Sequence, residues 1–195
     1  MTGQQQLARL QAALHDVDAR ATQLASSCPP WRWQQRAAGG GWAPSECVQH
    51  IVLSAEAMLG SVDEAMAAAP PTVGMDAGPY RTGLLGRALL WSLEPPYRLF
   101  RTRTSSEFVP AAPRPPEIDI PALLAAHGAA RESLARAQGL ALDRLQIASP
   151  FDTRVRYNVY AAFSLLPVHA RRHLWQAAQA MDSHVDIAPG PDSVH

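Results

Sequence analysis

The chain has 195 residues, enough for one domain with a full hydrophobic core and no need of disulfide support. Its 17 basic and 17 acidic residues cancel, so charge gives no reason to expect DNA, RNA or an anionic membrane as the main partner. A small-molecule substrate is therefore the simpler expectation.

The first two long helices are predicted from apolar spacing. Apolar residues three and four apart over residues 7–24 are typical of a helix in a left-handed bundle, and Pro29 and Pro30 should end that helix near Ser26. A second helix is expected from about residue 44 to residue 68, because proline suits the first turn of a helix.

The rest of the chain predicts two more long helices and a shorter one. The short helix is expected around residues 82–92. A long loop over residues 108–116 holds four prolines and no helical period. A third long helix should follow over residues 121–138 with Asp119 as its N-cap, and a last one over about residues 156–181.

Four long helices without a convincing alternating strand pattern predict an all-α four-helix bundle with a long proline-rich loop before the third long helix. We expect one domain over residues 1–186 and a flexible tail over residues 187–195, where proline and glycine cluster.

The location of the protein is predicted from its ends, its hydropathy and its thiols. Residues 1–6 lack the basic and apolar regions of a signal peptide, and the longest uncharged stretch, residues 157–170, is shorter than the roughly 20 residues that cross a bilayer. Cys28 and Cys47 have no metal-type spacing, which favours free thiols in a reducing compartment. We expect a cytoplasmic protein.

Three histidines form a candidate metal site. His169 and His173 are four residues apart, so on a helix their imidazoles lie on one face within reach of one ion. His50, in the second helix, is the candidate third ligand. Three protein ligands leave a coordination position open for water or substrate, as in catalytic sites. The alternative is that all three are ordinary core or surface histidines, since pairs four apart also occur by chance.

Two blocks of sequence resemble the DinB-like superfamily, in its Trp-containing branch. The first block, residues 42–51, combines a tryptophan, a polar helix start and a histidine followed by an aliphatic residue. The second comprises Phe151 and Asp152, followed by a helix that ends in the pattern His169-x-x-x-His173-x-x-Gln176.

The resemblance implies a DinB-like four-helix bundle of the up-down-down-up type, often dimeric. It also implies a divalent ion, zinc or nickel, bound by His50, His169 and His173. Relatives include thiol-dependent S-transferases and isomerases that use bacillithiol or mycothiol. A low-molecular-weight thiol is therefore the expected small-molecule substrate, and a homodimer the expected assembly.

One position departs from the family pattern. Many members carry an acidic residue directly after the first histidine of the second block, where this chain has Ala170. A His-Glu-x-x-His metalloprotease is excluded as well, because that chemistry needs the glutamate as general base.

Four further residues have both a functional and a structural interpretation. Glu46 is a candidate proton acceptor at the open position, or a first-turn glutamate that complements the helix dipole. Gln176 would orient an imidazole, or pack at a bundle end. His127 is a possible fourth ligand, but a hydrogen-bonded core histidine is favoured. Cys47 could coordinate the metal or react, but a buried apolar role is favoured.

The leading functional hypothesis is a metal-dependent enzyme that transfers a low-molecular-weight thiol to a small electrophile, with metal-assisted hydrolysis as a close neighbour. A non-catalytic bundle that binds metal or a small ligand during stress is the alternative. A protein without metal is the third.

Overall fold

The computed structural model describes residues 1–37, 40–70, 78–94 and 105–182. Its helices and strands follow in this order: α1 Gly3–Ser26, α2 Pro30–Trp33, α3 Pro44–Ala67, α4 Gly83–Leu93, the 3-10 turn η1 Ser106–Phe108, α5 Pro116–Arg136, β1 Gln146–Ala148, β2 Arg156–Asn158 and α6 Val159–Asp182. The predicted tail, residues 187–195, lies outside the described residues.

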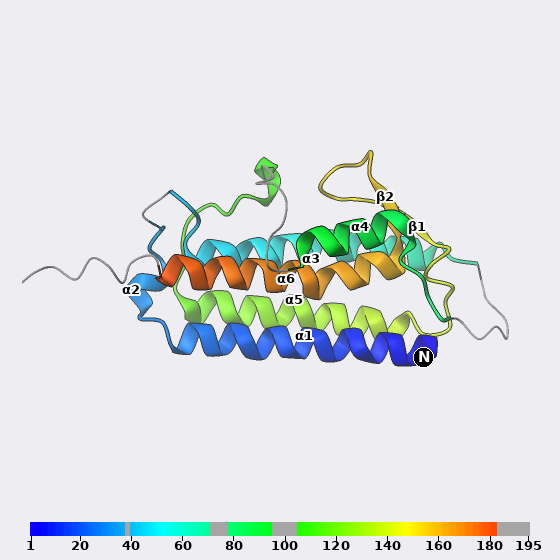
Figure 1. The fold of residues 1–195 in the computed structure, drawn as a ribbon, viewed down its shortest axis with the longest axis horizontal. Helices are drawn as coiled ribbons and strands as arrows, with labels where there is room; N and C mark the ends of the chain where they lie inside the picture. Colours follow the sequence, from blue (N-terminus) through cyan, green and yellow to red (C-terminus); the bar gives the residue numbers. More distant parts are fainter. Residues whose placement is uncertain (38–39, 71–77, 95–104, 183–195) are drawn as a thin grey trace, which may run out of the picture.

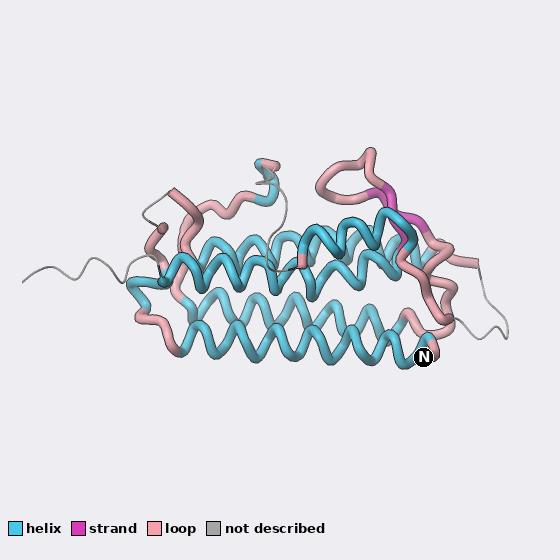
Figure 2. The backbone as a smooth tube through the Cα atoms, in the orientation of Figure 1, coloured by secondary structure: helices cyan, strands magenta, loops and turns pink. Residues whose placement is uncertain are grey.

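The four long helices α1, α3, α5 and α6 lie side by side in one bundle (Figure 1; Figure 2). Helix α3 packs against α5 and α6, and α1 packs against the same two helices. In Figure 1, α1 and α6 run in one direction, and α3 and α5 run in the other. This is the predicted up-down-down-up arrangement. The shorter α4 packs against the outer side of the bundle on α6.

The bounds of the first two long helices agree with the prediction, for identifiable local reasons. Helix α1 begins with a capping box, in which Gln5 N donates to Thr2 Oγ1 at 3.2 Å and Thr2 N donates to Gln5 Oε1 at 2.9 Å. Its end is followed by Pro29 and Pro30, which begin the short α2. Pro44 occupies the first turn of α3, where its missing N–H costs nothing.

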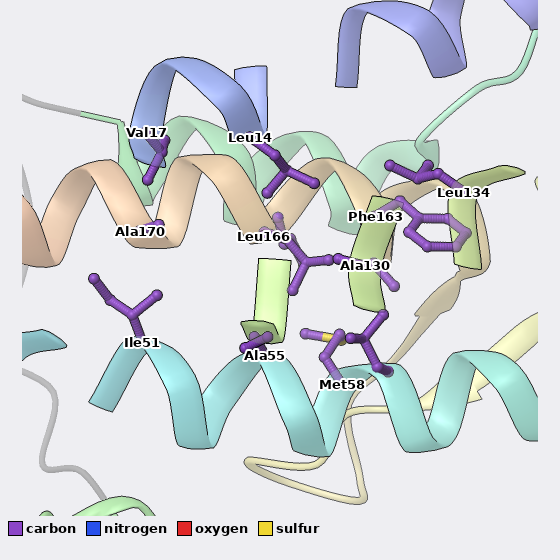
Figure 3. Packing of buried hydrophobic residues seen from close by; sticks show 14 of the residues in the cluster. Leu14, Val17, Ile51, Ala55, Met58, Ala130, Leu134, Phe163, Leu166 and Ala170 are labelled. Atoms are coloured by element: carbon purple, nitrogen blue, oxygen red, sulfur yellow. The ribbon is translucent and has the colours of Figure 1, made fainter. Parts of the chain in front are cut away.

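The core is formed by apolar side chains from all four long helices (Figure 3). Leu14, Leu134 and Phe163 come from three different helices and are almost fully buried. Each buried side chain of this size stabilises the fold by about 1.5–3 kcal/mol. The apolar stripes therefore fix which face of each helix points inward, and with it the faces that carry the histidines.

The third long helix begins earlier than predicted, so the prediction that Asp119 is an N-cap is wrong. Helix α5 begins at Pro116 and contains Pro121 within its first turns. Pro121 lacks the N–H that would otherwise bond to the carbonyl of Glu117, so it removes one intrahelical hydrogen bond near the start of the helix. Asp119 lies inside the helix, fully buried, and accepts hydrogen bonds from Trp33 Nε1 and Arg114 Nε, both at 3.0 Å.

A two-stranded antiparallel ribbon was missed, and it also replaces the predicted start of the last helix. Strands β1 and β2 pair with Ile147 opposite Tyr157, and α6 begins at Val159 rather than near residue 156. Both paired side chains are buried at the end of the bundle. Strands of three residues are too short for an alternating pattern to be recognised.

None of the helices in the described part of the chain is long and apolar enough to cross a membrane.

Candidate metal centre

The three predicted ligands meet between α3 and α6. His50 lies near the start of α3, and His169 and His173 lie on successive turns near the middle of α6. Because the two helices run in opposite directions and pack together, the start of α3 lies beside the end of α6 (Figure 1). The i, i+4 spacing in α6 then points both imidazoles toward α3.

The geometry of the cluster fits a single metal ion. One nitrogen from each of the three imidazoles lies within 4.8 Å of the other two. The Nε2 atoms of His169 and His173 are 3.1 Å apart. Two imidazole nitrogens bound to one tetrahedral zinc ion would lie about 3.3 Å apart. The three residues therefore could hold a metal ion without large movement of either helix.

A backbone carbonyl determines which nitrogen of His50 is available. The Nδ1 atom of His50 lies 2.8 Å from the carbonyl oxygen of Phe108, so Nδ1 carries the proton and donates it. The lone pair of Nε2 is then free to bind a metal ion. A carbonyl on the second nitrogen is the usual partner of a metal-binding histidine.

The environment keeps all three imidazoles neutral, which is the form that binds metal. Burial lowers the pKa of His50, although the bond to Phe108 partly opposes the shift. Burial, then the nearby His50 and Arg172, lower the pKa of His169 to about 3. The pKa of His173 is also well below its usual value, mainly through burial and then through the other two histidines.

Aromatic rings surround the cluster. The ring centroid of Trp42 lies 4.9 Å from that of His50, and the ring of Phe151 lies 6.0 Å from that of His169. Phe151 is 38% exposed, Trp42 is half-buried, and His169 is the least buried of the three histidines. A ligand would therefore approach on the side of His169, between apolar walls that exclude water.

The family follows from the sequence comparison. The family model of the DinB superfamily matches residues 13–177, which is most of the chain. The chain belongs to the DinB superfamily. The searches of curated proteins and of solved structures gave no match.

In this DinB superfamily member, Glu46 does not face the histidines as a proton acceptor. Its carboxylate is fully buried, accepts a hydrogen bond from Ala43 N at 2.9 Å and pairs with the guanidinium of Arg36. Both contacts fix the first turn of α3. Glu46 therefore has the structural role, at the helix start, that the sequence favoured.

Cys47 and His127 are also absent from the cluster. Burial, then the charge of Glu46, raise the pKa of the Cys47 thiol to about 12, so it stays protonated and unreactive. His127 is fully buried and its Nδ1 lies 2.5 Å from Asp18 Oδ1. It is the hydrogen-bonded core histidine that the sequence favoured, and it is not part of the metal cluster.

Gln176 lies beside the cluster. Its side chain approaches the His173 imidazole closely enough to raise the pKa slightly, against the larger lowering effects. The Nδ1 atom of His173 nevertheless has no hydrogen-bond partner of regular geometry among the described residues. The place of Gln176 beside His173 agrees with the first of its two sequence interpretations, orientation of an imidazole, which stays a prediction.

Sequence reasoning missed the contribution of the loop before α5. The carbonyl of Phe108 accepts from His50, 58 positions away, and the ring of Phe108 lies tilted against that of Phe151 with centroids 4.7 Å apart. No residue pattern marks a backbone carbonyl as a partner. Only the position of the proline-rich loop over the start of α3 identifies it.

The lowered pKa values predict an acid-sensitive fold in the absence of metal. In the unfolded chain the imidazoles take up protons near pH 6.5, whereas in the folded chain His169 does so only near pH 3. Between these values the unfolded state binds more protons, so stability falls as pH falls, by at most about 1.4 kcal/mol per pH unit for each such histidine.

Urea unfolding checks this expectation. The free energy of unfolding of the chelator-treated parent and of a His169→Gln variant would be measured between pH 7.5 and pH 5. The parent should lose stability more steeply than His169→Gln on acidification. The exposed His15 provides the control, and His15→Gln should behave like the parent. Equal slopes for the parent and His169→Gln would contradict the expectation.

Proposed function

We propose that this DinB superfamily member is a metal-dependent enzyme that transfers a low-molecular-weight thiol to a small electrophile. The observation that supports it best is the convergence of three neutral imidazole nitrogens within 4.8 Å of one another. Three such ligands leave one coordination position free for a reactant. Zinc and nickel are the ions we propose, since both suit imidazole ligands.

The chain's own residues would supply orientation and a dry environment. A divalent ion at this site lowers the pKa of a thiol or water bound to it and so supplies a nucleophile near neutral pH. Trp42, Phe108 and Phe151 border the histidines with apolar surface, which suits an apolar electrophile. Their rings would hold the electrophilic carbon beside the sulfur and exclude competing water.

The proposed transfer is balanced without an oxidant or reductant. The thiol loses its proton to solvent, and its sulfur forms a bond to the electrophilic carbon. The bond from that carbon to chloride, or to an epoxide oxygen, breaks and its electron pair leaves with that atom. With an epoxide, the oxygen then takes up a proton from water.

One observation favours the non-catalytic alternative. In the described part of the chain no carboxylate belongs to the cluster, and none contributes to the pKa shifts of its histidines. No described carboxylate at the cluster could therefore act as general base in a reaction that requires one. Thiol transfer requires none, which is why we place it above hydrolysis.

The test is an assay of zinc- or nickel-loaded protein with a panel of low-molecular-weight thiols and chlorinated or epoxide electrophiles. Turnover should appear in the parent and in His15→Gln, and should fall at least about 100-fold in His169→Ala. A parent rate no higher than that of His169→Ala would count against transfer. Ester hydrolysis by the same samples would then favour hydrolysis, and bound metal without turnover would favour the non-catalytic alternative.

A further inference from the structure

Hydrogen bonds join the segment from Phe108 to Arg114 to the first turns of α3. The carbonyl of Phe108 accepts the proton of His50 Nδ1 at 2.8 Å. Four residues later in the segment, the carbonyl of Ala112 accepts a hydrogen bond from Gln49 Nε2 at 3.0 Å. The partners on α3 are therefore neighbours in sequence, and the second contact restrains the segment that supplies the first.

The side chain of Gln49 donates two hydrogen bonds at this contact between the segment and α3. Its side-chain amide is buried, and Nε2 donates both to Ala112 and to Ser45 Oγ, the latter at 2.8 Å. Ser45 Oγ also accepts from the backbone N–H of Arg114 at 2.7 Å. The Gln49 amide therefore bonds the segment directly at Ala112, and it shares the Ser45 hydroxyl as an acceptor with the backbone N–H of Arg114.

The far end of the segment is anchored independently. The Arg114 guanidinium donates to Asp119 Oδ1 at 3.0 Å, and the other oxygen of that buried carboxylate accepts from Trp33 Nε1. This end would stay in place if Gln49 were changed. The effect of such a change should therefore be concentrated near Phe108 and His50.

The segment is also linked to His169 of α6, through Phe151 in the loop between β1 and β2. The ring of Phe108 lies 4.7 Å from the ring of Phe151, which in turn lies 6.0 Å from the ring of His169. A displacement of Phe108 would thus affect ligands on both α3 and α6. A hydrogen bond that holds the Phe108 segment in place therefore affects the positions of both His50 and His169.

We propose that Gln49 is a positioning residue of the metal site. It holds the carbonyl of Phe108 on Nδ1 of His50, which keeps the proton on that nitrogen and leaves Nε2 free to bind the ion. The inference rests on the proposed metal-binding function, but the position of the proton on His50 can be measured without metal.

Gln49→Met is the most informative change, because methionine has a similar unbranched length and no N–H donor. Gln179→Met is the matched control, since Gln179 is exposed on α6. Partners that orient metal ligands typically contribute 10- to 100-fold to metal affinity. We expect a loss of that size in cobalt(II) affinity for Gln49→Met, with an altered visible spectrum of bound cobalt, and no change for Gln179→Met.

A second readout uses metal-free protein. The ¹⁵N shifts of the His50 ring should report a proton on Nδ1 in the parent and a mixture of the two tautomers in Gln49→Met. If Gln49→Met does not fold, Ser45→Ala removes the shared acceptor with a smaller change and should shift both readouts in the same direction.

The outcomes separate this inference from the proposed function. Cobalt affinity and a His50 tautomer equal to those of the parent would overturn the role of Gln49 and leave the metal site intact. A parent that binds no cobalt would overturn the proposed function. The tautomer of His50 in Gln49→Met would then still decide whether Gln49 fixes that side chain.

Discussion

Replacing His169 with alanine is expected to abolish tight binding of zinc and nickel. The Nε2 atom of His169 lies 3.1 Å from that of His173, and its ring centroid lies 5.1 Å from that of His50, so it contacts both other ligands. Its removal leaves two imidazoles in an apolar surrounding, with no carboxylate in the described cluster to replace it. Two neutral ligands are too few to retain an ion that proteins usually hold with three or four.

Elemental analysis and thermal melting check this expectation on protein purified without a histidine tag. The parent should carry close to one metal ion per chain, and its Tm should rise with added metal. A free metal concentration of 1,000 times Kd corresponds to about 4.1 kcal/mol of stabilisation, which is lost when binding is lost. His169→Ala and His50→Ala should show neither property, whereas the exposed-site variant His15→Gln should retain both.

Metal-free His169→Ala should be about as stable as the metal-free parent at neutral pH, because the imidazole is neutral there and lies at the least buried edge of the cluster. This comparison separates loss of ligand from loss of fold. A parent without metal after incubation with zinc or nickel would contradict the proposed site. Unchanged metal content in His169→Ala would contradict the assigned ligand set.

Replacing Asp18 with alanine is expected to cost about 3 kcal/mol of folding stability. Asp18 joins α1 to α5: its Oδ1 lies 2.5 Å from Nδ1 of the fully buried His127, and its Oδ2 lies 2.6 Å from the Arg131 guanidinium. The other ring nitrogen of His127 is buried without a partner among the described residues. Loss of the carboxylate would leave a buried imidazole with no hydrogen bond at all, which is strongly unfavourable.

Urea denaturation at pH 7 measures the effect, and Asp16→Ala in the same helix is the matched control. Asp16 is exposed and pairs with Arg20 on the surface, so its removal should change stability by less than about 0.5 kcal/mol. An Asp18→Leu, His127→Leu double variant should recover much of the loss, because apolar side chains need no partner. Similar losses for Asp18→Ala and Asp16→Ala would contradict the expectation.

The metal content of the same samples tests whether His127 is a fourth metal ligand. His127 lies outside the histidine cluster of the described structure, so Asp18→Ala should retain the metal of the parent wherever it is folded. A fall in metal content without unfolding would restore His127 as a fourth ligand, which the sequence had left open.

The sequence by itself determined the elements whose signals are local. Apolar spacing and the prolines at 29, 30 and 44 predicted α1 and α3, because both depend on interactions within a few residues. The spacing of His169 and His173 predicted a shared face, because four residues make about one turn. His50, the candidate third ligand, lies in another helix, so its prediction required the two helices to pack together, which no local rule gives; the resemblance between short blocks supported it.

Only the tertiary structure decided the partners of these residues. Asp18 meets His127 across 109 positions, and Phe108 meets His50 across 58, through the docking of helices and a loop rather than through spacing. The early start of α5 likewise depends on Asp119 being buried against Trp33 and Arg114 instead of capping a helix. Periodicity identifies the inward face of a helix, but the neighbour that occupies each contact depends on how whole faces pack together.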